Sequence, residues 1–374
     1  MPTEIGGFVA SGFEPVRREF ERNFSERGEI GAAFAVHRDG EQLVDLWGGM
    51  ADLQTGRPWD AETLVCIFSG TKALVAMCVL MLLDRGSLEL EAPVARYWPE
   101  LRAKTVVVRD IVSHTARLPG VTQDVTIDEF ADALHMAGLL EHEQQNEDPR
   151  AALCYHAFTY GWLCDGLVRR VDGRSVGRFF ADEIALPLAL DAWIGLPGEL
   201  DSRVARLELA DDWPQSPHLQ AETLARDDLT RSIWGNPPVF DRGAFPWNDA
   251  RYRRAEIPGA GAIATPRSMA RLYASLPALV SPRTLELART PWSEGPDVVH
   301  GAAQRFGVGF QLQTDALVLG PDTGAFGHGG AGGSIHGVWP SSGVGFSYGM
   351  NELRDRDALD PRSWTLLHAL HSAL

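Results

Sequence analysis

The sequence predicts an α/β fold into which a mostly helical region is inserted. Two observations predict it: strand-like segments occur near both ends of the chain, and helical patterns fill the middle. Strands from the two ends complete one sheet if the ends lie together. We therefore expect a discontinuous α/β domain formed by residues 1–86 and 255–374, and a helical domain with long loops over residues 87–254.

The N-terminal part predicts a helix, two strands and a buried helix. Apolar residues at helical spacing predict a helix over residues 13–28, and residues 30–49 predict two strands joined by a turn at Asp39-Gly40. Residues 63–90 begin as an extended segment and become helical near Ser69. Because this last helix is apolar almost all round, we expect it to be buried.

The rest of the chain has a less regular order of predicted helices, strands and loops. The region before residue 255 shows helical patterns interrupted by proline-rich and acidic loops. Thr265 and Pro266 are a suitable N-cap and first residue for a further helix. The segments that follow predict strands and then a closing helix, over residues 306–312, 325–340, 343–353 and 361–374.

Composition excludes several classes of partner and site. The chain has 374 residues and a formal net charge of −16, which argues against a nucleic-acid or anionic-membrane surface, because both require basic patches. The longest apolar run, residues 73–83, is shorter than the about 20 residues of a transmembrane helix. The N-terminus lacks the pattern of a signal peptide, so we expect a cytoplasmic protein. The oligomeric state is left open.

The cysteines and histidines predict no disulfide, metal or cofactor. No C-x-x-C pair and no H-E-x-x-H spacing occurs, so we expect the cysteines to be reduced core residues. The four cysteines are Cys66, Cys78, Cys154 and Cys164. His114, His300 and His336 would be candidates for a Ser-His-Asp triad. We expect His114 to be packed or hydrogen-bonded, and no second feature supports His300 or His336.

The segment "GRSVG", residues 173–177, matches the G-x-S-x-G pattern of a lipase nucleophile elbow. An elbow serine needs a buried strand before it and a helix after it. The preceding residues instead have helical spacing. We therefore expect Gly173 to end one helix and Ser175 to be the N-cap of the next.

A different serine has the properties of a nucleophile. In "FSGTK", Ser69 and Lys72 are spaced i, i+3, so they share one face of a helix. Lys72 is the only charged residue between Glu62 and Asp84. Burying a lysine in an apolar helix is costly, so its presence there indicates a function. Burial favours its neutral form, which can accept the serine proton, whereas the charged form can stabilise an anion.

Two further segments can complete such a site. Tyr155, expected at the start of a helix, becomes a general base for Ser69 if an adjacent ammonium lowers its pKa. The glycine-rich segment "FGHGGAGGS" lets a substrate lie close to the backbone at a strand edge. A free N–H there, with that of Ser69, can form an oxyanion hole.

These motifs resemble the serine β-lactamase and penicillin-recognising superfamily, and within it the class C-like esterases called family VIII carboxylesterases. The resemblance runs from "CIFSGTKAL" through "YHAFTYGWL" to "FGHGGAGGSIHGVWP". It implies a β-lactamase/transpeptidase-like fold with an antiparallel sheet flanked by helices. It also implies that Ser69 is the acylated nucleophile, Lys72 the lysine of S-x-x-K and Tyr155 the tyrosine of Y-x-N.

The resemblance also assigns the substrate-binding strand. His328, Gly329 and Gly330 stand where the superfamily has K-T-G, and the oxyanion donors would be the backbone N–H groups of Ser69 and Ala331. The asparagine of Y-x-N is replaced by Ala157. A neutral imidazole is a poorer carboxylate anchor than an ammonium. Both replacements argue against an efficient β-lactamase or a peptidoglycan enzyme.

We expect a serine carboxylesterase that cleaves small uncharged esters through an acyl-enzyme on Ser69. One alternative is an acyltransferase that uses the same acyl-enzyme, with an acceptor pocket lined by aromatic residues of the 213–252 segment: Trp213, Trp234, Phe240, Phe245, Trp247 and Tyr252. The same residues could equally be core. A weak β-lactamase and a catalytically silent relative that only binds a ligand are two further hypotheses.

Overall fold

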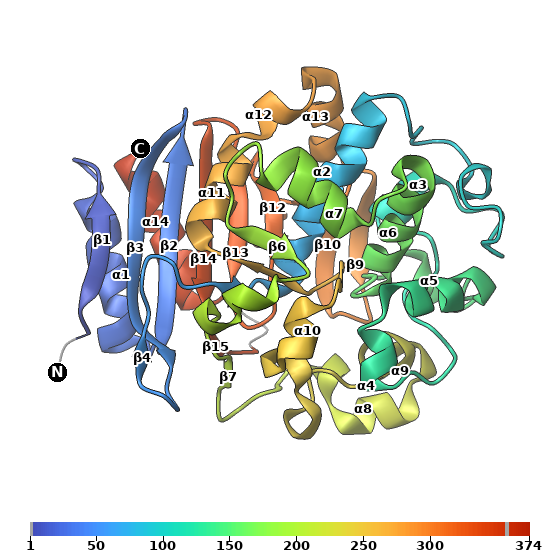
Figure 1. Cartoon of the computed structure of the whole chain (residues 1–374), viewed down its shortest axis with the longest axis horizontal. Helices are drawn as coiled ribbons and strands as arrows, with labels where there is room; N and C mark the ends of the chain where they lie inside the picture. The colour runs from blue at the N-terminus through green and yellow to red at the C-terminus, as the bar shows by residue number, and fades with distance from the viewer. Residues whose placement is uncertain (1–2, 356–358) are drawn as a thin grey trace.

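The protein is described from a computed structural model that covers residues 3–355 and 359–374. One large antiparallel sheet crosses the molecule in the order β1-β3-β2-β14-β13-β12-β11-β10-β9, and β4 pairs with the C-terminal end of β3 (Figure 1). N-terminal and C-terminal strands meet in the middle, where β2 pairs with β14 and Val36 lies opposite Phe346. The expected antiparallel sheet made from both ends of the chain is therefore confirmed.

The strands of the large sheet are mostly short, apart from β2, β3 and β14. They are β1 (Ile5–Val9), β2 (Gly31–Arg38), β3 (Glu41–Asp52), β4 (Arg57–Pro58), β9 (Ser293–Asp297), β10 (Ala302–Phe306), β11 (Gln311–Leu312), β12 (Phe326–Gly329), β13 (Ile335–Trp339) and β14 (Val344–Met350). Two small sheets join distant segments: β5 (Val65–Cys66) and β6 (Ala192–Ile194) flank β8 (Ala262–Ala264), and β7 (Glu208–Leu209) pairs with β15 (Glu352–Leu353).

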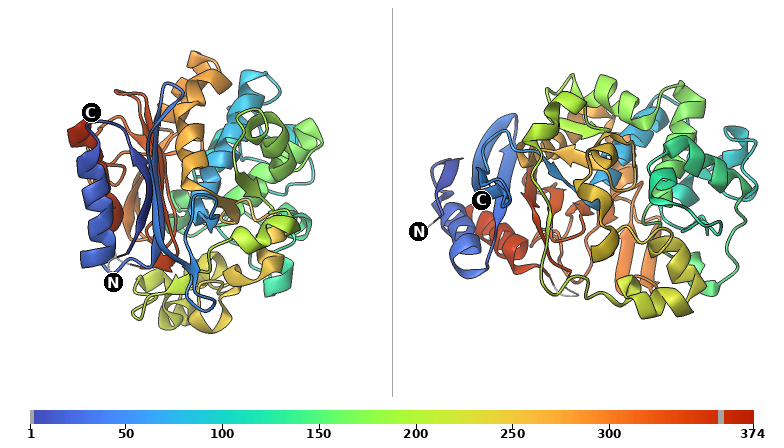
Figure 2. Two further views of the ribbon diagram at one scale, coloured as in Figure 1. Left: turned by 60° about the vertical axis from the view of Figure 1, so that its left-hand side comes forward. Right: turned by 60° about the horizontal axis from the view of Figure 1, so that its bottom comes forward.

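Helices cover both faces of the sheet. On one face α1 packs against α14, so the first and last helices of the chain lie side by side (Figure 2). On the other face lie α11 and, beyond it, α2 and the remaining helices. The helices are α1 (Glu14–Glu26), α2 (Thr71–Asp84), α3 (Val108–Val112), α4 (Ile127–Phe130), α5 (Ala133–His142), α6 (Thr159–Asp172), α7 (Val176–Phe180), α8 (Ala221–Arg226), α9 (Asp228–Trp234), α10 (Ala250–Arg254), α11 (Pro266–Ala274), α12 (Leu276–Leu279), α13 (Pro282–Arg289) and α14 (Pro361–Ala373).

The predicted helices and strands mostly agree with the observed ones to within a few residues, with two differences. The single strand expected over 306–312 is interrupted by a turn, because Gly307 and Gly309 bend the backbone and the N–H of Gly307 donates to the carbonyl of Phe310 at 2.9 Å. Strand β9 has no signal in the sequence, because Ser293–Asp297 contains glycine and proline and lacks an apolar alternation. The region 87–254 is mostly helical but also contributes β6 and β7.

A fully buried arginine joins the two ends of the chain. The side chain of Arg362, at the start of α14, forms an ion pair with Glu29 at 3.1 Å and with Asp360 at 2.7 Å. It also donates to the carbonyls of Gly332 at 2.9 Å and Glu352 at 3.1 Å. Because Gly332 follows β12, this network fixes the glycine-rich segment of the sequence to the core.

We expect Arg362→Ala to destabilise the protein by about 3–5 kcal/mol, because it leaves the buried carboxylate of Glu29 without its partner. Urea unfolding measures the loss. Arg178→Ala is a suitable control, since Arg178 is 69% exposed and its ion pair with Asp182 is solvated. Equal unfolding midpoints for the two variants would contradict the structural role of Arg362.

Candidate active site

The nucleophile candidate lies in a tight turn at the start of the buried helix. Ser69 is the middle residue of a 3-10 turn, Phe68–Gly70, that runs directly into α2. Phe68 has a φ of +44°, a left-handed conformation that is unfavourable for a bulky residue and is found mostly at functional sites. The helix therefore begins two residues later than expected, and Ser69 is partly exposed while its neighbours are buried.

The aromatic-rich segment packs behind this turn. The ring of Phe68 lies 5.6 Å from that of Phe240 and 5.1 Å from that of Trp247. The ring of Trp234 lies 6.4 Å from that of Tyr155. All of these rings are buried, so the segment contributes packing that holds Phe68 and Tyr155 in place, in line with the expectation that these residues could be core.

Lys72 is completely buried and lies directly against Ser69. Its Nζ is 3.3 Å from the Oγ of Ser69 and donates to the carbonyls of Ala157 at 2.6 Å and Gly259 at 2.7 Å. A neutral amine can donate to the two carbonyls and accept from the serine hydroxyl at the same time. The backbone of Ala157 thus contacts Lys72, although its side chain cannot replace the amide of an asparagine.

Tyr155 comes to the site from a loop, which corrects the expected helical position. Helix α6 begins only at Thr159, because the backbone groups of residues 155–157 bond to side chains of other elements. The Nζ of Lys72 lies 4.6 Å from the centre of the Tyr155 ring. The phenol also lies 3.5 Å from the Nε2 of His328.

Burial dominates the electrostatics of Lys72 and Tyr155. It lowers the pKa of Lys72 well below its usual range. It raises the pKa of Tyr155 strongly, and the hydroxyl of Ser69 offsets only part of that rise. The expectation that Lys72 lowers the pKa of Tyr155 is therefore wrong for the free protein, because a dry site penalises the charged form of both groups. The neutral amine is the better proton acceptor.

His328, the residue at the lysine position of K-T-G, is a neutral neighbour of Tyr155. Its Nδ1 lies 2.7 Å from the carbonyl of Gly329, so Nδ1 carries the proton and Nε2 is the acceptor that faces the phenol. Its pKa is lowered to about 3, and burial is the main cause. The side chain therefore brings no positive charge at neutral pH.

Two backbone N–H groups are available beside the nucleophile. Within residues 3–355 and 359–374, the N–H groups of Ser69 and Ala331 have no recorded hydrogen-bond acceptor. The segments that carry them touch, because a Cβ added to Gly330 would lie 2.4 Å from the carbonyl oxygen of Ile67. Two unpaired donors on adjoining segments are suited to bind an oxyanion.

The glycines of this segment lie close to other parts of the chain. Gly330 allows contact with Ile67, Gly332 lies against Leu353, and Gly333 lies against Asp360. Gly329 is different, because a Cβ added there would meet its nearest neighbour at an ordinary 3.6 Å. That these glycines also let a substrate lie close to the backbone stays a prediction.

Ser175 has the capping role expected for it. Its Oγ accepts from the N–H of Arg178 at 3.1 Å and donates to Glu256 at 2.8 Å, at the start of α7. Gly173 has a φ of +91° and ends α6. The setting is helix–turn–helix, and no histidine contact of Ser175 is recorded among the described residues.

The histidines considered for a triad are packed around the site. The Nδ1 of His114 accepts from the N–H of His156 at 3.0 Å, and its ring stacks on Tyr160. His336 bonds Ser347 through Nδ1 at 2.7 Å. The ring of His300 lies 5.4 Å from that of Tyr155, a proximity for which the sequence holds no signal. The cysteines are free and buried, as expected.

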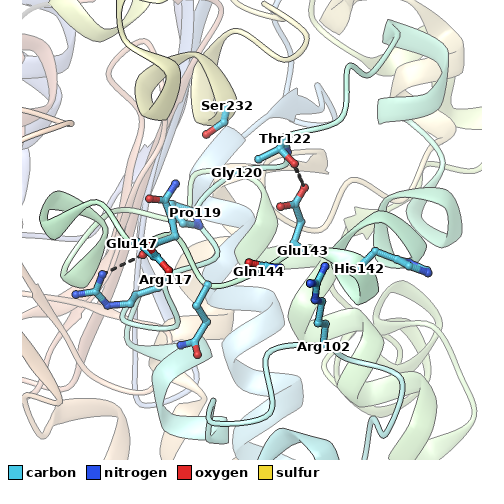
Figure 3. Close-up of a pocket in the computed structure, with 12 residues that line it drawn as sticks. Arg102, Arg117, Pro119, Gly120, Thr122, His142, Glu143, Gln144, Glu147 and Ser232 are labelled. Atoms are coloured by element: carbon cyan, nitrogen blue, oxygen red, sulfur yellow. Dashed lines mark hydrogen bonds between the residues drawn. The ribbon is translucent and has the colours of Figure 1, made fainter.

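The described residues contain a separate polar hollow on the helical side of the molecule. It encloses about 460 Å³, and its lining includes Arg102, Arg117, Thr122, His142 and Glu143 (Figure 3). None of the candidate site residues lines it. In residues 3–355 and 359–374 no cluster of three potential metal ligands occurs, and no helix there has the length and apolar character needed to span a bilayer.

The fold and the site together define a class of protein. In it, an antiparallel sheet with a helical region beside it brings together an S-x-x-K serine, a tyrosine and a glycine-rich strand. The chain belongs to the beta-lactamase family, whose model matches residues 17–369. Its fold is therefore of the β-lactamase/transpeptidase type.

Several relatives resemble the chain over nearly its whole length. The esterase/beta-lactamase LipL of Mycobacterium tuberculosis is 33% identical over 91% of this chain and 81% of its own. The structure of a family VIII carboxylesterase has a TM-score of 0.90 and 32% identity, over 99% of this chain and 100% of that one. A penicillin-binding protein homologue from Caulobacter crescentus has a TM-score of 0.90 and 34% identity over the same shares.

The depressed pKa of Lys72 can be measured directly. Lys72 and Lys104 are the only lysines in the sequence, so protein labelled with ¹³C-lysine gives one side-chain signal for each. We expect the Lys72 signal to titrate well below about pH 10.4, the usual value for lysine. K104M removes the signal of the other lysine, which is exposed, and assigns that of Lys72. Titration of the Lys72 signal at about pH 10.4 would contradict the effect of burial.

The same shift predicts how stability depends on pH. The pKa of Lys72 is lower in the folded protein than in the unfolded chain. At pH values between these two pKa values, the unfolded chain binds a proton at Lys72 and the folded protein does not. The unfolding free energy of the wild type relative to K72M should therefore rise with pH in that window, by at most about 1.4 kcal/mol per pH unit. Urea unfolding at several pH values measures the difference, and a flat difference would be the contrary result.

Proposed function

We propose that the protein is a serine carboxylesterase that forms an acyl-enzyme on Ser69. The contact of 3.3 Å between the Ser69 hydroxyl and the buried amine of Lys72 is the observation that carries the proposal. The relatives support it, because the names of LipL and of the family VIII carboxylesterase describe ester hydrolases. An esterase of Burkholderia gladioli, EstB, is also 39% identical over 26% of this chain.

Acylation uses the neutral amine. As the Oγ of Ser69 attacks the ester carbonyl, its proton passes to Lys72. Lys72 is free to accept the proton because burial has lowered its pKa and left the amine neutral. The backbone N–H groups of Ser69 and Ala331 stabilise the oxyanion. The proton then goes to the leaving alcohol oxygen, directly or through the phenol of Tyr155, which burial keeps protonated.

Deacylation repeats these steps with water in place of the alcohol. Water attacks acyl-Ser69, its proton passes to Lys72, and the acid is released with the serine hydroxyl restored. The substrate is an uncharged ester, because His328 is neutral and gives a substrate carboxylate no ammonium to pair with. His328, Gly329 and Gly330 line the substrate side of the site in this proposal.

The two serines give the decisive comparison. We expect Ser69→Ala to reduce hydrolysis of p-nitrophenyl acetate by at least about a thousandfold and to abolish the mass adduct with a serine-reactive phosphonate. Ser175→Ala should still hydrolyse the ester and form the phosphonate adduct. It should lose about 1 kcal/mol of stability, as expected for a lost N-cap. Loss of activity in the Ser175 variant alone would overturn the assignment.

The pH dependence separates the possible bases. If Lys72 accepts the proton, kcat/KM falls at low pH as Lys72 becomes charged, so the acid limb should coincide with the ¹³C titration of Lys72. A limb that does not follow Lys72 would transfer the role of base to Tyr155.

The name of LipL favours a second candidate, β-lactam hydrolysis at the same serine. We expect it to be weaker than ester hydrolysis by at least about a hundredfold in kcat/KM, because the neutral His328 cannot bind the lactam carboxylate as an ammonium does. Nitrocefin and p-nitrophenyl acetate measure the ratio. Comparable rates would make the protein a β-lactamase, whereas ester exchange with added alcohols would indicate acyl transfer.

A further inference from the structure

The loop that carries Tyr155 is held by other parts of the chain. Residues 155–157 lie outside regular secondary structure. The N–H of His156 donates to the Nδ1 of His114 at 3.0 Å, and the carbonyl of Ala157 accepts from Lys72 at 2.6 Å. The N–H of Tyr155 itself donates to the carboxylate of Asp297 at 2.6 Å. The position of the phenol therefore depends on side chains from three other elements.

Asp297 is unusual among these side chains because it is a buried carboxylate. It is the last residue of β9 and is 1% exposed. One of its oxygens accepts from the N–H groups of Val299 and His300, at 3.0 and 2.9 Å, and the other accepts from Tyr155. Among residues 3–355 and 359–374, no arginine, lysine or histidine forms an ion pair with it. Backbone N–H groups alone compensate its charge.

One side chain thus joins the catalytic loop to the turn between β9 and β10. That turn presents the ring of His300, which lies 5.4 Å from the ring of Tyr155. A buried carboxylate without a cationic partner is costly to maintain. The bond to Tyr155 gives this carboxylate a part in the site as well as in the fold.

We propose that Asp297 is a positioning residue for the acyl-transfer reaction, whose carboxylate fixes the backbone of Tyr155 so that the phenol lies between Lys72 and His328. The inference rests on the proposed function of Ser69 and adds a residue to it. Asp297 acts through Tyr155 and does not touch the reacting atoms.

The charge of Asp297 gives this role a measurable signature. The titratable groups recorded against Tyr155 are Lys72, His114, His300 and His328, together with Asp297. Burial is the main cause of the raised pKa of Tyr155, and the carboxylate of Asp297 adds to it. Removing that charge and its hydrogen bond to the backbone of Tyr155 should therefore lower the rate of the reaction, whereas loosening a turn would cost stability only.

Asp297→Asn is the test variant. Asparagine is isosteric and has one carbonyl oxygen, which can serve either the turn or Tyr155 but not both. Asp322→Asn is the matched control, because Asp322 is also buried, 8% exposed, and accepts from the turn N–H of Gly324 at 2.7 Å without contacting Tyr155. Ester hydrolysis over a range of pH and thermal unfolding are measured for the wild type and both variants.

We expect Asp297→Asn to lower kcat by about tenfold to a hundredfold with little change in KM, since a small displacement of a catalytic group costs rate. The acid limb of its pH profile should stay in place, because that limb follows Lys72. Asp322→Asn should lose stability only. If Asp297→Asn behaves like Asp322→Asn, with kcat unchanged, the positioning role is overturned. If the wild type itself hydrolyses no ester and forms no Ser69 adduct, the proposed function fails first.

Discussion

The candidate site depends on placing the amine of Lys72 where water cannot reach it. A lysine in water is charged and cannot accept a proton from serine. Within α2 the surrounding side chains are apolar, and among the described residues the partners of the amine are two carbonyls and the Ser69 hydroxyl. Burial without a carboxylate partner favours a neutral amine, which can accept from the nucleophile. The charge state in which the amine can accept a proton is thus a consequence of burial.

A dry site imposes demands on the rest of the fold. Phe68 adopts an unfavourable φ of +44° in order to present Ser69, and the rings of Phe240 and Trp247 hold it there. The glycine-rich segment that carries Ala331 is fixed by Arg362, which donates to the carbonyl of Gly332. Residues remote in sequence therefore maintain a geometry that local preferences oppose.

Polar side chains take the place of regular secondary structure around the reacting groups. Asp297 and His114 bind the backbone of the Tyr155 loop, where a helix or strand would have used its own hydrogen bonds. The positive charge that the superfamily places on the substrate strand is absent here, because His328 is neutral in these surroundings. This neutral side chain is the basis for proposing an uncharged substrate.

Local chemistry is sufficient to predict much of this protein. The spacing of Ser69 and Lys72, the apolar helix that contains them and the helical setting of Ser175 can all be predicted, because helix periodicity and capping act over a few residues. The union of strands from both ends also follows from their pattern. The superfamily resemblance supplies Tyr155 and Ala331, which spacing alone would not join to Ser69.

Tertiary structure decided the rest. The loop position of Tyr155 depends on Asp297, a residue 142 positions away that no motif marks. The proximity of His300 depends on the same turn. The pKa of Tyr155 is raised where the sequence predicted that it would be lowered. A pKa reflects the solvent and the charges around a group in space, and these are not defined until the chain is folded. The sequence determined which groups can react, and the fold determined where they lie and which of them is charged.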